Sequence, residues 1–146
     1  MKRKFFTFIV AIALMACTVL PAAAMSSVEL AACELVNDRR EANGLEPLEI
    51  SEDLSVKARI KSRDMKDRGY FDHHSPTYGS PFMLMRSLGI SYRSAGENIA
   101  MGYKTAEAVV SAWMRSPGHR ANILSTRYDA IGIGHVDGYW TQWFIG

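Results

Sequence analysis

The C-terminal stretch 130–145 constrains the fold most strongly. Two runs of alternating residues flank an Asp137-Gly138 pair there, and this arrangement is typical of a β-hairpin with a two-residue turn. In the register that this turn sets, Gly132 and Gly134 share one face of the hairpin. Because glycine carries no side chain, we expect a bulky ring or a helix to approach that face closely.

Helical spacing and helix end signals precede the hairpin. A Ser or Thr stands before each predicted helix, and a Gly follows several of them. The predicted helices cover 27–43, 51–69, 81–89, 105–115 and 116–124, and 90–92 is a candidate short strand. The charged residues of the second helix are assigned to its solvent-exposed face: Lys57, Arg59, Lys61, Arg63, Asp64, Lys66 and Asp67. Helices covering a small antiparallel sheet predict an α+β sandwich.

Residues 1–24 are typical of a secretory signal peptide. Three basic residues are followed by an apolar run over 5–20, and the segment ends in a proline and small residues with a cleavage pattern after Ala24. A run this short suits cleavage better than a permanent transmembrane helix. The competing interpretation is a lipoprotein anchored at Cys17, because the residues before this cysteine resemble a lipobox.

Cleavage changes the charge balance. The chain has 17 Lys and Arg against 15 Asp and Glu, and three of the cations lie in 1–24, so the mature chain has 14 against 15. A net charge of −1 gives no reason to expect nucleic acid or an anionic membrane surface as a partner. We expect residues 25–146 to form one domain, without stable membrane insertion and as a monomer.

Cys33 is the one cysteine of the predicted mature chain, so an internal disulfide is excluded. It falls within the apolar stripe of the first predicted helix. This position favours a small buried side chain over a reactive thiol. The domain therefore depends on packing, for which its Trp, Tyr, Phe and Met residues provide the material.

Two clusters carry the side chains suited to chemistry. The first, 70–76, contains His73, and the second, 96–100, contains Glu97 and is followed one helix later by His119. We expect all three in turn-rich or helix-start positions. Imidazole and carboxylate groups bind divalent metals and transfer protons near neutral pH. These three residues are the candidate ligand-binding cleft, the candidate metal ligands and the candidate catalytic groups.

The motifs 70–76, 96–100, 113–124 and 139–142 occur in one order that resembles the CAP superfamily. This superfamily, also called SCP-like, includes cysteine-rich secretory proteins, antigen 5 and plant pathogenesis-related proteins. The chain looks most like the disulfide-free branch of sporulating Gram-positive bacteria, and the resemblance covers about residues 28–145. It implies an α-β-α sandwich whose central cleft carries two histidines and two acids, which bind zinc in some members.

Carried over residue by residue, the resemblance assigns His73 to the first histidine and Glu97 to the acid of the Gly-Glu-Asn motif. Tyr139 stands where animal and plant members have the second histidine, and Ser116 stands where they have the second acid. In the bacterial branch His119 takes the place of the missing histidine. The resemblance thus implies zinc or another divalent metal as the candidate cofactor.

Each candidate also has a structural interpretation. His73 could tie turn carbonyls together, Glu97 could cap backbone amides, and His119 could be a first-turn helix residue. For His135 the choice stays open between lining a cleft and packing under a helix. Ser75 and Ser116 are each followed by Pro, which favours turn and cap roles over a nucleophile.

Three classes of function remain. The favoured one is a secreted domain that binds an extracellular or cell-envelope ligand, with or without a metal ion. The second is a metal-dependent hydrolase of cell-wall or protein bonds, in which bound water attacks. The third is a structural protein of the envelope or spore. The expected location is extracellular, including the cell wall or the spore, and an anchor at Cys17 is the alternative.

Overall fold

The computed structural model describes residues 24–146 of the chain. The predicted signal peptide, apart from Ala24, and the alternative lipid anchor at Cys17 lie outside the described residues. The elements, in chain order, are α1 (Ser27–Glu41), β1 (Glu49–Ile50), α2 (Glu52–Arg68), α3 (Pro81–Ser87), β2 (Ala95–Met101), α4 (Ala106–Arg115), α5 (Pro117–Ile123), β3 (Ala130–Val136) and β4 (Tyr139–Ile145). No helix among the described residues is long and apolar enough to cross a membrane.

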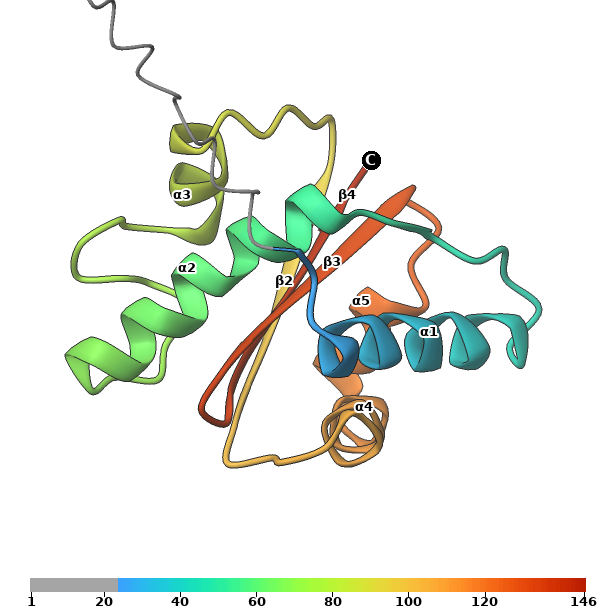
Figure 1. The fold of residues 1–146 in the computed structure, drawn as a ribbon. Helices are drawn as coiled ribbons and strands as arrows, with labels where there is room; N and C mark the ends of the chain where they lie inside the picture. The colour runs from blue at the N-terminus through green and yellow to red at the C-terminus, as the bar shows by residue number, and fades with distance from the viewer. Residues whose placement is uncertain (1–23) are drawn as a thin grey trace, which may run out of the picture.

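The elements form three layers, with the sheet in the middle (Figure 1). Helices α2 and α3 cover one face, and α1, α4 and α5 cover the other. The α1 side holds a core around Trp113, Trp140 and Phe144, and the α2 side holds a smaller core around Trp143 and Met85. This arrangement confirms the predicted α+β sandwich.

The sheet has the order β1-β3-β4-β2. Strands β3 and β4 form the predicted hairpin in the predicted register, with His135 opposite Trp140. Strand β2 pairs antiparallel with β4, whereas the two-residue strand β1, which the sequence pattern did not predict, pairs parallel with β3. The sheet is therefore mixed, although antiparallel pairing dominates it.

The two hairpin glycines explain how closely α2 lies on the sheet. A Cβ atom added at Gly134 would come within 2.2 Å of the backbone nitrogen of Arg59, and one at Gly132 within 2.5 Å of that of Ser55. The helix backbone thus occupies the space that side chains would need. The prediction that a bulky element approaches this face is confirmed, and the element is α2.

Two predictions about local structure were wrong. The candidate strand at 90–92 is not a strand; Ile90 is buried against α3, and the strand begins at Ala95 and contains the Gly-Glu-Asn motif. Glu97 is therefore on an edge strand rather than in a turn. The motif forms a strand because its main chain pairs with β4, a tertiary interaction that outweighs the turn preference of Gly and Asn.

The charges of α2 are also not all solvated. Lys61 is fully buried, Asp64 is 8% exposed, and the side chain of Arg59 is 18% exposed. Each of the three has oppositely charged or hydrogen-bonding partners within the fold, which offsets the cost of removing the charge from water. The solvated-face prediction fails for these positions because α2 is covered on more than one side.

Candidate functional site

His73 and Glu97 meet although they come from different parts of the fold. His73 lies in the loop after α2 and Glu97 on β2, and Nδ1 of His73 is 2.7 Å from Oε1 of Glu97. The carboxylate side chain is 2% exposed, whereas the imidazole is 53% exposed. The pair therefore presents a histidine to solvent, with a buried acid behind it.

Trp143 fixes the other oxygen of the same carboxylate. Its indole Nε1–H donates to Oε2 of Glu97 at 2.7 Å, and the two residues are cross-strand partners on β2 and β4. Both carboxylate oxygens of Glu97 thus have a hydrogen-bond partner. The orientation of the acid is set by the sheet itself, and His73 is aligned on it.

The two candidate histidines differ in protonation tendency. The hydrogen bond to Glu97 raises the pKa of His73 above its ordinary value, and burial only partly opposes this effect. Burial lowers the pKa of His119, and the nearby charge of His73 lowers it further. Near neutral pH the site therefore combines one imidazole that holds a proton readily with one that stays neutral.

Lys61 holds the loop that carries His73. Its ammonium donates to the carbonyl oxygens of Asp72 at 2.7 Å and His73 at 2.9 Å, and to the hydroxyl of Tyr70 at 3.1 Å. Burial lowers the pKa of Lys61, while the negative charges of Glu97 and Asp64 oppose that shift. A buried cation with three oxygen acceptors thus determines where the main chain of His73 lies.

Asp64 holds the far end of the same loop. It accepts hydrogen bonds from the hydroxyls of Tyr70 and Ser75, the latter at 2.7 Å. The hydroxyl oxygen of Ser75 in turn accepts the N–H groups of Thr77 and Tyr78, both at 3.0 Å. This is the turn role predicted for Ser75. The neighbouring His74 is exposed and makes no part of this network.

Helix α5 brings His119 to the site, and an amide network anchors the helix. Asn98 Nδ2 donates to the carbonyl oxygen of His119 at 3.1 Å and to Oε1 of Gln142 at 2.8 Å. Asn122 Nδ2 donates to Oδ1 of Asn98 at 2.9 Å. His119 is in the first turn of α5, as predicted, but Ser116 makes no side-chain cap bond. The asparagine of the Gly-Glu-Asn motif therefore positions α5.

A cleft of about 260 Å³ lies between the loop after α2 and helices α4 and α5. Its walls are mostly apolar, and they are formed by Phe71, Ile99, Ala100, Met101, Tyr103, Ala112, Trp113, Ser116 and His119. Phe71 and Met101 are 46% and 48% exposed at its mouth. The structure thus brings His73 and Glu97 into direct contact and places His119 in the wall of this cleft.

The three candidates do not form a metal-ligand cage as they stand. Among residues 24–146, no group of three or more His, Cys, Asp or Glu side chains is placed to hold a metal ion. The Nδ1 atom of His73 and one oxygen of Glu97 are engaged with each other. Zinc binding by His73, Glu97 and His119 stays a prediction.

His135 has a structural role. Its Nε2 accepts the N–H of Gly138 at 3.0 Å, its own N–H donates to Oε1 of Glu29 at 2.9 Å, and its ring lies 4.1 Å from that of Trp140. Burial lowers its pKa, so the neutral ring that accepts this bond is favoured. Of the two possibilities left open, His135 packs within the fold and fastens the hairpin turn.

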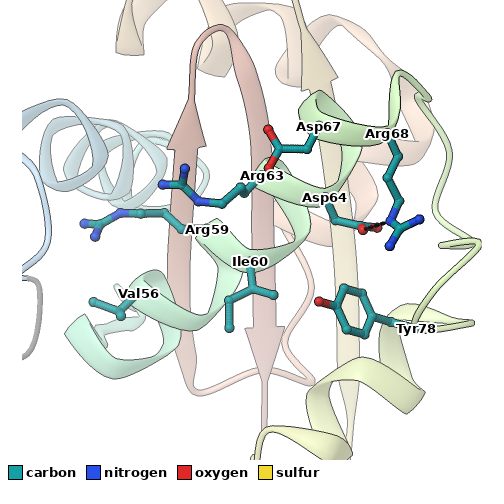
Figure 2. Close-up of a pocket in the computed structure, with 8 residues that line it drawn as sticks. All are labelled: Val56, Arg59, Ile60, Arg63, Asp64, Asp67, Arg68 and Tyr78. Carbon is teal, nitrogen blue, oxygen red and sulfur yellow. Dashed lines mark hydrogen bonds and ion pairs between the residues drawn. The ribbon is translucent and has the colours of Figure 1, made fainter.

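A second hollow, of about 600 Å³, lies along the outer side of α2 beside Tyr78 (Figure 2). Three of its charged groups are already paired within the fold: Arg59 binds Glu29, and Arg68 and Asp64 bind each other. Much of its polar character therefore reflects contacts that stabilise the fold. It contains none of the three candidate residues.

The model of the cysteine-rich secretory protein family, CAP, matches residues 33–144. The chain belongs to the CAP family. A Bacillus subtilis protein named YkwD is 58% identical to this CAP domain over 124 residues, which are 84% of this chain and 48% of that protein. The chain thus spans about half the length of this relative.

Solved structures agree with the CAP assignment. An extracellular protein of Bacillus anthracis that contains an SCP domain superposes with a TM-score of 0.78 at 33% identity, over 80% of this chain and 39% of that one. An outer surface protein of Borrelia burgdorferi shares the fold, with a TM-score of 0.72 at 21% identity over 84% of this chain and 96% of that one.

Sequence reasoning missed two residues that build the CAP-domain site, Lys61 and Trp143. Lys61 continues the spacing of the buried residues Leu54, Ala58 and Met65 along α2, so it occupies an apolar stripe where solvation is not expected. This spacing was a usable signal. Trp143 had none, because its bond to Glu97 depends on the pairing of β2 with β4.

Proposed function

We propose that this CAP domain is an extracellular ligand-binding module, and that its binding site combines the cleft walled by Phe71, Ile99 and His119 with the His73–Glu97 pair, whose members are each two residues along the chain from a wall residue. The observation that carries the proposal is the bond between the half-exposed imidazole of His73 and the buried carboxylate of Glu97. A buried acid aligned on an accessible histidine, beside an apolar cleft, has the features of a specific ligand site.

The ligand class that we propose is a component of the cell envelope. The relative from B. anthracis is described as extracellular and the one from B. burgdorferi as an outer surface protein. The mostly apolar walls, with His119 and Ser116 as polar groups, suit a ligand that has both an apolar face and hydrogen-bonding groups.

A sedimentation assay with purified Gram-positive cell walls tests this function. The purified chain is mixed with wall fragments, and the fraction retained in the pellet is compared with that of His73→Ala. We expect His73→Ala to reduce retention, and His74→Ala, the substitution of the neighbouring exposed histidine, to leave it unchanged. Equal retention of all three proteins would contradict the proposed site.

The same incubation distinguishes the hydrolase and the structural alternatives. Soluble wall fragments that appear with zinc, disappear with chelator and are absent for Glu97→Gln would assign the chain to the metal-dependent hydrolases. A purely structural role predicts that His73→Ala and Glu97→Gln lower the melting temperature and leave retention unaltered.

A further inference from the structure

The edge of β2 forms one border of the cleft, and its main-chain groups alternate in direction. Residues 94 and 146 exchange two hydrogen bonds, and the N–H of Gly102 donates to the carbonyl of Gly138. In an antiparallel pair, the main-chain N–H and carbonyl groups of every second residue point toward the partner strand. The even-numbered residues of β2 thus face β4, and the N–H and carbonyl groups of the odd-numbered ones face outward.

Side chains of the same chain already occupy the outward carbonyls. The hydroxyl of Tyr128 donates to the carbonyl of Ala95 at 3.4 Å, Asn122 Nδ2 donates to that of Glu97 at 3.3 Å, and Trp113 Nε1 donates to that of Ile99 at 3.2 Å. The outward acceptors at residues 95, 97 and 99 are therefore satisfied within the domain.

The outward-facing N–H groups of β2 beside the cleft have no such partners among the described side chains. Within the part of the chain that the structure describes, the N–H groups of Ile99 and Met101 have no hydrogen-bond partner, and both residues line the cleft. Main-chain N–H groups at a partly buried position require an acceptor from water or from a ligand. Of the two outward carbonyls beside these donors, that of Ile99 is taken by Trp113, so this part of the edge offers more donors than acceptors.

This asymmetry selects among ligands. An extended peptide that added a strand to β2 would need outward carbonyls as well as N–H groups, and Trp113 and Asn122 block them. A carbonyl oxygen on a ligand can accept a hydrogen bond from the N–H of Ile99 or Met101. The adjoining wall of Trp113 and Ala112 is apolar, while the hydroxyl of Ser116, which makes no cap bond, lies in the same cleft.

We propose that the cleft binds the acetamido group of an N-acetylated amino sugar. Its carbonyl oxygen accepts from the N–H of Ile99 or Met101, its methyl group packs against Ala112, and its N–H donates to Ser116 or His119. The exposed ring of Phe71 at the mouth is available to pack against the sugar ring. This inference rests on the proposed function and specifies the chemistry of the ligand.

Titration with two matched trisaccharides tests the inference. Tri-N-acetylchitotriose carries the acetamido groups, and cellotriose has the same neutral ring type with hydroxyls in their place. We expect the first to shift the amide resonances of Ile99 and Met101 in ¹H–¹⁵N spectra. We expect cellotriose to bind at least about tenfold more weakly, a difference of about 1.4 kcal/mol. Equal binding of the two sugars, or shifts elsewhere only, would overturn the assignment.

Two variants locate the binding on the cleft. Ala112→Trp fills the cleft, and Ala108→Trp places the same bulk on the exposed side of α4; only the first should abolish binding of tri-N-acetylchitotriose. Because Ala112→Trp could disturb folding, Ser116→Ala serves as a milder change, and it should weaken binding severalfold without altering the melting temperature. Unchanged affinity in Ser116→Ala and Ala112→Trp would overturn the proposal.

A third probe separates the sugar from other amides. N-acetyl-dialanine amide has the acetamido chemistry without a sugar ring, and binding equal to that of the trisaccharide would overturn the assignment to an amino sugar. If tri-N-acetylchitotriose fails to bind while cell walls retain the chain through His73, the inference fails and the proposed function stands. If neither binds, both fail.

Discussion

His73 and Glu97 form a bond whose strength depends on the charge of the imidazole. Because Glu97 raises the pKa of His73, the contribution of this bond to the free energy of unfolding is fully present below the pKa of the unfolded histidine. It is lost as the pH rises through the higher pKa of the folded state. Since the imidazole is half exposed, solvent screens the interaction and the effect on stability is small.

Replacing the acid tests this coupling. In Glu97→Gln we expect the pKa of His73 to fall toward its ordinary value, because the amide carries no charge to favour the imidazolium. An NMR titration of the imidazole Cε1 proton measures the shift, and His74 in the same spectrum serves as an internal reference. An unaltered pKa of His73 would show that the bond does not govern its protonation.

Lys61 offers a second test at the level of one residue. Lys61→Met keeps the aliphatic stem but leaves the carbonyls of Asp72 and His73 without their donor. We expect a loss of about 1–3 kcal/mol in the free energy of unfolding and faster amide exchange in the loop 70–76. Lys57→Met removes a partly exposed lysine paired with Asp53 and should cost less than about 0.5 kcal/mol. Equal losses in the two variants would contradict the role of Lys61.

Helix α2 and the hairpin show how elements of this fold depend on each other. The contact between the helix backbone and Gly132 and Gly134 allows α2 to lie flat on β3, and the same contact places Lys61 and Asp64 beneath the His73 loop. The position of the loop therefore follows from two residues without side chains on the far side of the helix.

Gly134→Ala tests this dependence. The added Cβ would lie 2.2 Å from the backbone nitrogen of Arg59, so either the helix or the strand has to move. We expect a loss of about 1–3 kcal/mol in the free energy of unfolding, as in other overpacked cores, measured by urea denaturation. Gly118→Ala in α5, where an added Cβ meets nothing within 4 Å, should be neutral or slightly stabilising.

At the level of elements, much of the fold was predictable because its signals are local. The Asp137-Gly138 turn, the serine and threonine caps and the proline at the start of α3 all act over a few residues. Strand β2 was missed because Gly and Asn normally favour turns. The pairing of His73 with Glu97 joins residues 24 positions apart across two layers, so spacing alone does not show it, and only the resemblance to CAP proteins indicated it.

Across the whole molecule, Glu29 connects the two helical layers through the sheet. Glu29 lies in the first turn of α1, its carboxylate binds Arg59 of α2 through both oxygens, and one oxygen also accepts the N–H of His135 on β3. Burial alone would raise the pKa of Glu29, but the bond to Arg59 and the backbone N–H donors outweigh burial and lower it. The layers are thus joined by one ionised group.

Because the pKa of Glu29 is lowered in the folded protein, its contribution to stability depends on pH. A lowered pKa contributes stability above the unfolded value, near 4.5, and that contribution is lost as the pH falls through the folded value. We expect Glu29→Gln to lose about 2 kcal/mol at pH 7 and to differ less from the unsubstituted protein in acid. Urea denaturation at several pH values measures this. Glu34→Gln, on the exposed side of α1, is the control and should show no such convergence.

The two borders of the sheet have a consequence for how the protein behaves among its neighbours. On one side β1 covers only the start of β3, and the next outward N–H groups of β3, at Ile133 and His135, donate to side chains of Ser55 and Glu29. On the other side the side chains of Tyr128, Asn122 and Trp113 interrupt the ladder of β2. Fibrillar aggregates grow when one chain extends the exposed ladder of another. Neither border of this sheet provides a continuous template, so the folded domain is protected against joining such a fibre at high concentration.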